Sequence, residues 1–161
     1  MRPWRISQVM DRGAHADLGV RLSFVVQQED EMQFPRDVKY TKNDEWIRVE
    51  GDQGTIGITD YAQDQLSDIV FVELTLALGE QAAQGAACAT IESVKAAAEV
   101  YLPVGGTVTR LNEDLPKNPE QVNREPFGAA WMVQIKISNA AELTDLMDTA
   151  AYETYCQERS H

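Results

Sequence analysis

The sequence predicts a mostly β domain of the α+β class, a barrel or sandwich of short antiparallel strands with helices at its edge. Three observations support this prediction. Short apolar or alternating runs recur between residues 46 and 137, glycines and prolines separate these runs, and helical signals are confined to one short internal stretch and the C-terminal end. Many short strands with frequent turn signals are typical of such domains.

The first predicted strands form a hairpin. Residues 46–50 and 55–59 alternate apolar with polar side chains, and the Gly-Asp-Gln-Gly sequence at 51–54 supplies the turn between them. Residues 69–74 follow as a mainly apolar run with a single acidic residue. A short run of this kind predicts a buried strand.

Two helices are expected. Asp60 followed by Gln63 has the form of a capping box and begins a short helix that ends before residues 67–68. Asn139 followed by Glu142 has the same form and predicts the start of a C-terminal helix. Apolar residues then recur at helical spacing, which predicts that this helix packs on the sheet; these residues are Leu143, Leu146, Met147 and Ala150.

Four further strands complete the prediction. Residues 88–94, 98–102 and 107–111 are strand candidates, and Pro103 with a Gly-Gly turn separates the second from the third. Prolines then mark a long loop at Pro116, Pro119 and Pro126. A last strand carries its apolar residues on one face, namely Trp131, Val133, Ile135 and Ile137.

The composition excludes several classes of protein. The chain of 161 residues carries 14 Lys and Arg against 26 Asp and Glu, a formal net charge of -12, and it lacks the basic cluster that binds nucleic acid. Its apolar runs, such as residues 69–72, are far below the roughly 20 residues of a membrane span. With 43% hydrophobic residues the chain can form a core. We therefore expect a globular protein that binds neither nucleic acid nor membrane.

The cysteines and histidines are too few and too dispersed for the common catalytic and metal sites. Cys88 and Cys156 lie far apart, and Cys88 stands among alanines, as a buried small hydrophobic residue does. His15 and His161 both lie near the ends of the chain. This argues against a histidine dyad, a zinc site and most hydrolase chemistry, so we assign no catalytic and no metal-binding residue.

Residues 1–31 are expected to be an extension outside the folded domain, which spans residues 32–161. They hold four arginines, no lysine and a polar end before Met32. Three interpretations of their origin stay open. The first is a transit peptide, against which Asp11 and Asp17 argue. The second is a secretory signal, which would need an apolar core that the segment lacks. The third is a leader, with Met32 as an alternative start.

One lysine stands alone in an acidic stretch. Lys95 is the only Lys or Arg between Arg48 and Arg110, and nine acidic residues lie in the same stretch. It falls at or beside the turn that connects two strand candidates, and small residues follow it. Such a turn is exposed and open to a second enzyme, although on local chemistry alone an ordinary solvated lysine is the simpler explanation.

Six stretches of the sequence carry a family resemblance. They are Tyr-Thr-Lys-Asn-Asp-Glu-Trp at 40–46, Gly-Ile-Thr-Asp-Tyr-Ala-Gln at 57–63, Asp-Ile-Val-Phe-Val-Glu-Leu at 68–74, Glu-Ser-Val-Lys-Ala at 92–96, Asn-Pro-Glu-Gln-Val-Asn at 118–123 and residues 128–131. In this order they resemble the H protein of the glycine cleavage system. The resemblance implies a lipoyl-type barrel-sandwich hybrid of short antiparallel strands, with a short internal helix and a C-terminal helix.

The resemblance also implies a function, that of a non-catalytic carrier whose Lys95 bears lipoic acid in amide linkage. In this family a pyridoxal-phosphate glycine decarboxylase (P protein) loads the aminomethyl group of glycine onto the lipoyl arm. A folate-dependent aminomethyltransferase (T protein) removes it, and dihydrolipoamide dehydrogenase (L protein) reoxidises the dithiol. A lipoate ligase or lipoyl transferase attaches the arm. The carrier supplies attachment, presentation and docking, because the difficult chemistry belongs to the cofactors.

A cleft in which the loaded arm can rest is a further implication of the resemblance. The resemblance implies that Glu45, Asn43 and Glu99 line this cleft. Glu45 matches the glutamate that helps to line it, and Glu99 stands where an aspartate is usual. Asn43 and Asp44 depart from the Ser-His pair commonly found before that glutamate. A cleft that excludes water and pairs with the amine slows the loss of ammonia from the arm.

One alternative function stays open, a lipoyl relay or H-like paralogue that donates lipoate to other lipoyl domains. Biotin carriage is disfavoured because Val94 and Ala96 flank the lysine, where biotinyl domains typically carry methionines. An enzyme of its own is disfavoured by the lack of a phosphate-binding glycine loop or a metal cluster in the sequence. We expect a monomer of the bacterial cytoplasm, with the mitochondrial matrix as the alternative, whose acidic surface suits basic partners.

Overall fold

The computed structural model describes residues 5–9, 23–27 and 31–160. The chain divides into two compact units, Met1–Gln33 and Phe34–His161. Among the residues described, no helix is long and apolar enough to cross a membrane.

The first unit contains two short strands. Strands β1 (Arg5–Val9) and β2 (Ser23–Gln27) pair antiparallel, with Arg5 opposite Gln27. Most of residues 1–31 lie outside the described residues, so the predicted extension and the three interpretations of its origin stay predictions.

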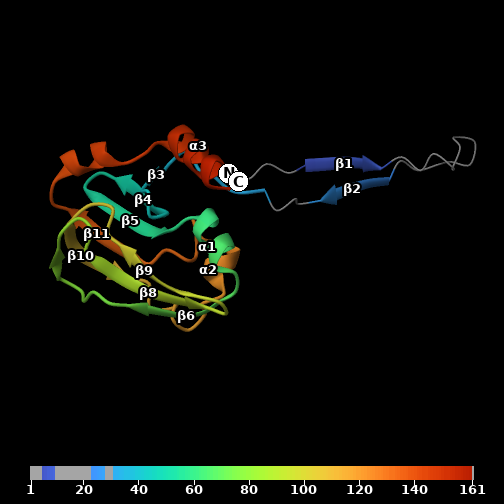
Figure 1. Ribbon diagram of the computed structural model, residues 1–161. Coiled ribbons are helices and arrows are strands. Elements are labelled where there is room, and N and C mark those ends of the chain that lie inside the picture. Colours follow the sequence, from blue (N-terminus) through green and yellow to red (C-terminus); the bar gives the residue numbers. More distant parts are fainter. Residues whose placement is uncertain (1–4, 10–22, 28–30, 161) are drawn as a thin grey trace, which may run out of the picture. The chain divides into compact units, whose positions relative to one another are not determined.

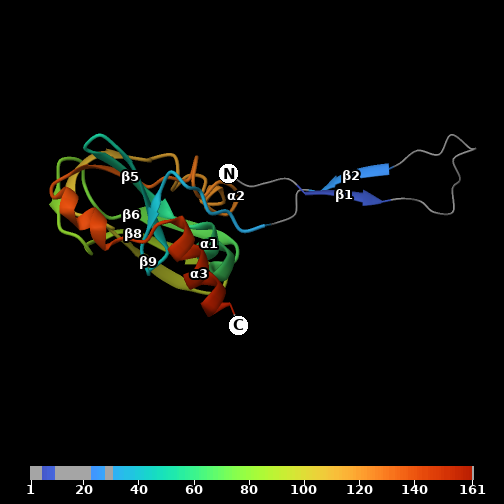
Figure 2. The same ribbon diagram turned by 90° about the horizontal axis from the view of Figure 1, so that it is seen from above.

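The second unit contains two antiparallel sheets, which Figures 1 and 2 show from two sides. The larger sheet has six strands in the order β3 (Lys39–Tyr40), β4 (Glu45–Glu50), β5 (Gln53–Ile58), β11 (Val133–Ile137), β10 (Gly106–Leu111) and β7 (Gln81–Ala82). The smaller sheet has the order β6 (Ile69–Leu74), β8 (Ala87–Ser93) and β9 (Ala97–Tyr101). The prediction of a mostly β fold with short antiparallel strands is confirmed, and the two sheets do not form one closed barrel.

The core lies between the two sheets. Side chains from both of them are fully or almost fully buried, and they include Ile47, Ile56, Val133 and Ile135 from the larger sheet and Val72, Ile91 and Val100 from the smaller. Burial of one such aliphatic side chain stabilises the fold by about 1.5–3 kcal/mol. Cys88 is also buried in this core, as its small-residue surroundings predicted.

The internal helix forms where predicted, but it begins one residue earlier than the capping-box pattern indicated. Helix α1 spans Asp60–Leu66, and its N-cap is Thr59, whose hydroxyl accepts a hydrogen bond from the backbone N–H of Ala62 at 3.2 Å. Asp60 is the first helical residue and accepts a bond from the Gln63 side chain at 2.6 Å. A second short helix, α2 (Gln121–Arg124), lies in the predicted proline-rich loop and next to α1 (Figure 1).

The C-terminal helix begins about ten residues later than predicted. Residues Ala140–Asp145 form a 3₁₀ helix, and α3 spans Thr149–Arg159 with Asp148 as its N-cap. Between them the backbone is extended, because Met147 exchanges two backbone hydrogen bonds with Tyr40, at 2.8 and 2.9 Å. This tertiary pairing overrides the helical spacing of the apolar residues. The Glu142 carboxylate accepts from the Gly105 N–H at 2.9 Å, so it does not complete a capping box with Asn139.

The prediction of a wholly buried strand at residues 69–74 is wrong. Only Ile69 and Val72 of β6 are buried, whereas Val70 and Phe71 are 55% and 43% exposed. The register of the β6–β8 pairing shifts between Ile69 and Phe71. A bulge of this kind breaks the simple alternation of buried and exposed side chains, which explains the difference.

The β4–β5 hairpin depends on a close contact between Gly57 and Trp46, which lie opposite each other. A Cβ atom on Gly57 would lie 2.8 Å from the Trp46 ring. That ring cannot shift easily, because its N–H donates to the carbonyl oxygens of Ile58 (2.9 Å) and Pro126 (3.0 Å).

We therefore expect Gly57→Ala to lower the free energy of unfolding by about 1–3 kcal/mol, measured by urea denaturation. Gly128→Ala is the matched control, since its Cβ would lie no closer than 3.5 Å to a neighbouring atom. The control should change stability by less than about 0.5 kcal/mol. Equal stability of the two variants would contradict the packing described.

Candidate functional site

The turn between β8 and β9 carries Lys95 at its tip, as predicted. Strand β8 ends at Ser93, β9 begins at Ala97, and Lys95 is exposed. The Ser93 hydroxyl oxygen accepts hydrogen bonds from the backbone N–H groups of Lys95 (3.2 Å) and Ala96 (3.0 Å), and the hydroxyl lies 3.1 Å from the Ala96 carbonyl oxygen. A serine that bonds successive backbone groups fixes a turn locally. The lysine side chain therefore projects from an ordered backbone.

The surface around Lys95 combines acidic and apolar side chains. Val94 is 66% exposed, and its N–H donates to the carbonyl oxygen of Asp68 at 3.0 Å, which ties the turn to the start of β6. Phe71 and Glu92 lie opposite each other in the β6–β8 pairing and are both exposed. Lys95 thus stands on an open surface of mixed acidic and apolar side chains.

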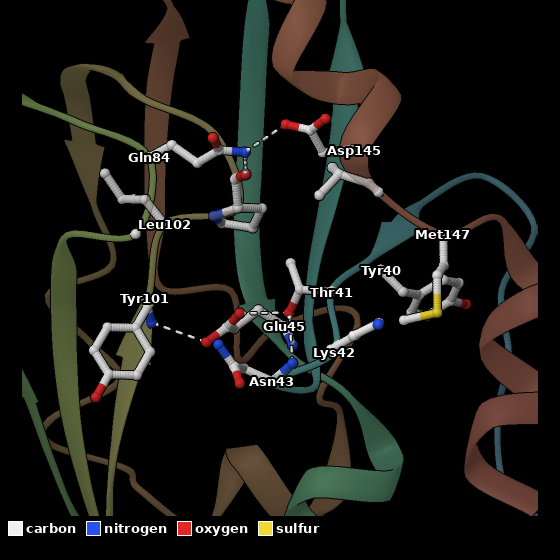
Figure 3. Close-up of a pocket in the computed structure, with 13 residues that line it drawn as sticks. Tyr40, Thr41, Lys42, Asn43, Glu45, Gln84, Tyr101, Leu102, Asp145 and Met147 are labelled. Carbon is white, nitrogen blue, oxygen red and sulfur yellow. Dashed lines mark hydrogen bonds between the residues drawn. The ribbon is translucent and has the colours of Figure 1, made fainter. Parts of the chain in front are cut away.

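A pocket of about 240 Å³ opens close to the start of β4 and the end of β9 (Figure 3). Four segments that are far apart in the sequence contribute its lining. They are residues 40–45 without Asp44, residues 84–85, residues 101–103 and residues 145–147.

Glu45 is the buried carboxylate of this pocket. It is only 2% exposed, its Oε1 accepts a hydrogen bond from the Thr41 hydroxyl, and its Oε2 accepts one from the backbone N–H of Tyr101 at 3.0 Å. Burial raises the pKa of the Glu45 carboxyl above its ordinary value; the bonds from Thr41 and Tyr101 lower it, and the charge of Asp44 raises it further. Figure 3 shows both bonds, which hold the carboxylate between the two sheets.

Glu45 has no cationic partner among the residues that the structure describes. The ion pairs in that part of the chain join Arg48 to Asp37 and Arg159 to Asp44. A buried carboxylate without a counter-charge carries a desolvation cost, and a cation that enters the pocket would offset it. The pocket is therefore chemically suited to a small cationic group.

The structure brings together two of the three residues predicted to line a cleft. Asn43 and Glu45 line the pocket, whereas Glu99 does not. Glu99 is exposed on β9, where alternation places it on the same face as Tyr101, a lining residue. This face begins beside the Lys95 turn, so Glu99 lies between the turn and the pocket along one strand.

Two residues that hold Glu45 were not predicted from the sequence. Tyr101 contributes its backbone N–H, and it lies 56 positions from Glu45, so no side-chain pattern could have revealed it. Thr41 also accepts a bond from the Glu45 backbone N–H at 3.1 Å. Local bonds of this type are common for threonine beside a turn, and they are the signal that could have identified Thr41.

Known proteins resemble this chain over most of its length. A family model described as Glycine cleavage H-protein matches residues 38–159. The chain is 50% identical over 127 residues to the glycine cleavage system H protein of Halothermothrix orenii, with 79% of this chain and 98% of that protein covered. It is 52% identical over 117 residues to the protein of that name from Beijerinckia indica, with 73% and 94% covered.

A solved structure supports the same assignment. The crystal structure of a glycine cleavage system H protein from Mycobacterium marinum matches with a TM-score of 0.68 at 29% identity, over 75% of this chain and 97% of that one. The family model spans well over half of the chain, and the relatives are matched almost whole. The resemblance seen in the sequence is confirmed, and the chain belongs to the glycine cleavage H-protein family.

Proposed function

We propose that this chain is the lipoyl carrier protein of the glycine cleavage system, with lipoic acid in amide linkage to Lys95. It carries the aminomethyl group of glycine from the decarboxylase (P protein) to the aminomethyltransferase (T protein), and it then presents the dithiol to dihydrolipoamide dehydrogenase (L protein). The observation that carries the proposal is an exposed Lys95 at the tip of an ordered turn, in a chain of this family.

The residues around Lys95 fit a covalent arm. Ala96 and Ala97 follow it and are small and exposed, so they leave the amine accessible to a lipoate ligase or lipoyl transferase. Amide formation removes the lysine charge, much as acetylation does. When attached, the lipoyl group supplies a ring disulfide that opens and closes by thiol–disulfide exchange.

Glu45 and Asn43 would receive the cationic end of the loaded arm. The Glu45 carboxylate is buried and lacks a counter-charge in the described part of the chain, so an entering amine would stabilise it. Asn43 lines the same pocket and offers an amide that can both donate and accept hydrogen bonds. Glu99 adds a negative charge on the strand that leads from the turn towards the pocket.

In this proposal the chain is not an enzyme, because the chemistry is performed by cofactors of the partner proteins. Its own residues attach the arm, hold its cationic end and exclude water from it. We propose a monomer of the bacterial cytoplasm, with the mitochondrial matrix as the alternative compartment, since the relatives reported above are bacterial.

Attachment of the arm is tested by intact-mass analysis of protein produced with lipoate and a lipoate ligase. We expect one lipoyl adduct on the wild-type chain and none on Lys95→Arg, which keeps the charge but offers no amine for the amide bond. Lys42→Arg is the matched control and should keep the adduct, since Lys42 is exposed but lies outside the turn. An adduct that persists on Lys95→Arg would refute the assignment.

The role of Glu45 is tested with carrier loaded by glycine and the decarboxylase and then separated from both. We expect Glu45→Gln to release ammonia about tenfold faster than wild type, because it loses a charged partner worth about 1.5–3 kcal/mol. Glu50→Gln, an exposed isosteric change on the same strand, should behave as wild type. The same release rate from all three proteins would show that Glu45 does not protect the arm.

Docking to the aminomethyltransferase is expected to be electrostatic. The stretch from residue 49 to 109 holds nine acidic residues, and amide formation would neutralise its single basic residue, Lys95. We expect a rise from roughly 0.05 to 0.5 M salt to weaken binding several-fold in isothermal titration calorimetry, since salt screens surface charges. An affinity that does not respond to salt would contradict this role for the charge.

A further inference from the structure

The C-terminal helix contacts the turn that precedes Glu45. Arg159 at the end of α3 makes a two-pronged ion pair with Asp44, in which Nη2 lies 2.6 Å from Oδ1 and Nη1 lies 3.1 Å from Oδ2. The Tyr152 hydroxyl donates to the same Oδ1 at 2.8 Å. A planar guanidinium that bonds both carboxylate oxygens fixes the direction of the side chain as well as its charge.

The Arg159 side chain is fixed in turn by its neighbours. Its guanidinium lies over two aromatic rings, 4.3 Å from the Tyr61 centroid and 3.9 Å from the Tyr155 centroid. Nη2 also donates to Cys156 Sγ at 3.4 Å. Cation–π contacts on two rings favour one orientation of the guanidinium. Arg159 is thus a preorganised partner for Asp44.

The backbone of the turn needs such support. Asp44 has a φ of 68°, which lies in the left-handed region that residues other than glycine seldom adopt. Its carbonyl oxygen accepts from the Thr59 N–H at 2.9 Å, and the Tyr155 hydroxyl donates to the Lys42 carbonyl oxygen at 3.0 Å. Helix α3 therefore contacts both residues 42 and 44, and Glu45 follows directly.

We propose that Arg159 is a positioning residue which, acting through Asp44, holds residues 41–45 in the conformation that places the Glu45 carboxylate in the pocket. The inference rests on the proposed function, in which the cationic end of the arm binds in this pocket. Here Asp44 takes a partner from the C-terminal helix, 115 positions away.

The test uses the backbone N–H of Tyr101, which bonds Glu45 Oε2 and so reports where the carboxylate lies. Amide hydrogen exchange is measured by NMR on the unmodified full chain. In Arg159→Gln we expect the Tyr101 N–H to exchange about tenfold faster, because residues 41–45 lose the ion pair that fixes their conformation. The adjacent Leu102 N–H, which bonds the Ala86 carbonyl oxygen at 2.8 Å, should keep its rate and so excludes general destabilisation.

Further variants separate positioning from mere folding defects. Asp44→Asn should raise the exchange rate of the Tyr101 N–H as Arg159→Gln does. The double variant should exchange little faster than either single variant, since both changes remove the same ion pair. Arg159→Lys should restore part of the protection and remains informative if Arg159→Gln does not fold. Arg110→Gln, which removes an arginine stacked 5.1 Å from the Trp131 centroid, is the control and should leave Tyr101 unchanged.

Unchanged Tyr101 exchange in the folded variants, or an equal rise at Leu102, would overturn the inference. The outcome is independent of the proposed function, because the exchange experiment needs no lipoate. If Lys95 were never lipoylated, the proposed function would fail while this result stood. Normal lipoylation of Lys95 with unchanged Tyr101 exchange would refute only the role of Arg159.

Discussion

The rest of the site depends on the burial of the Glu45 carboxylate and on the two hydrogen bonds that hold it. Taking a carboxylate out of water is costly unless hydrogen bonds or a cation compensate for it. The Thr41 hydroxyl and the Tyr101 N–H supply one bond to each oxygen, and the second of these joins the larger sheet to the smaller one. The position of the carboxylate is therefore coupled to the packing of the two sheets. These two hydrogen bonds offset only part of the desolvation cost of the carboxylate, and the remaining cost favours the entry of a cation.

Lys95 is exposed whereas Glu45 is buried, and strand β9 connects the surroundings of the two residues. In the proposed function, the lysine must stay exposed so that another enzyme can modify it, and the carboxylate must stay away from bulk water so that it binds an amine strongly. Strand β9 begins directly after the Lys95 turn and ends at Tyr101, beside the pocket. A single strand thus sets the separation between Lys95 and the pocket, and an arm attached to Lys95 would supply the motion between them.

The features that the sequence predicted correctly are those with local causes. The Lys95 turn follows from two short strands with small residues between them, and the burial of Cys88 follows from its alanine neighbours. The errors come from contacts between distant residues. Met147 pairs with Tyr40 and stays extended despite its helical spacing, and a bulge exposes Phe71 in an apolar run. In the same way, the Tyr101 N–H that holds Glu45 and the Arg159 that holds Asp44 belong to no local pattern.

Isotope exchange between bicarbonate and the carboxyl group of glycine measures whether this chain acts as a carrier in glycine cleavage. The assay contains the glycine decarboxylase and the purified chain, lipoylated or not. We expect exchange to rise with the concentration of lipoylated chain and to be absent with unmodified chain, because only the lipoyl arm can take up the aminomethyl group. If the lipoylated chain supported no exchange with a decarboxylase that is active towards another H protein, the carrier role would be refuted and a lipoyl relay favoured.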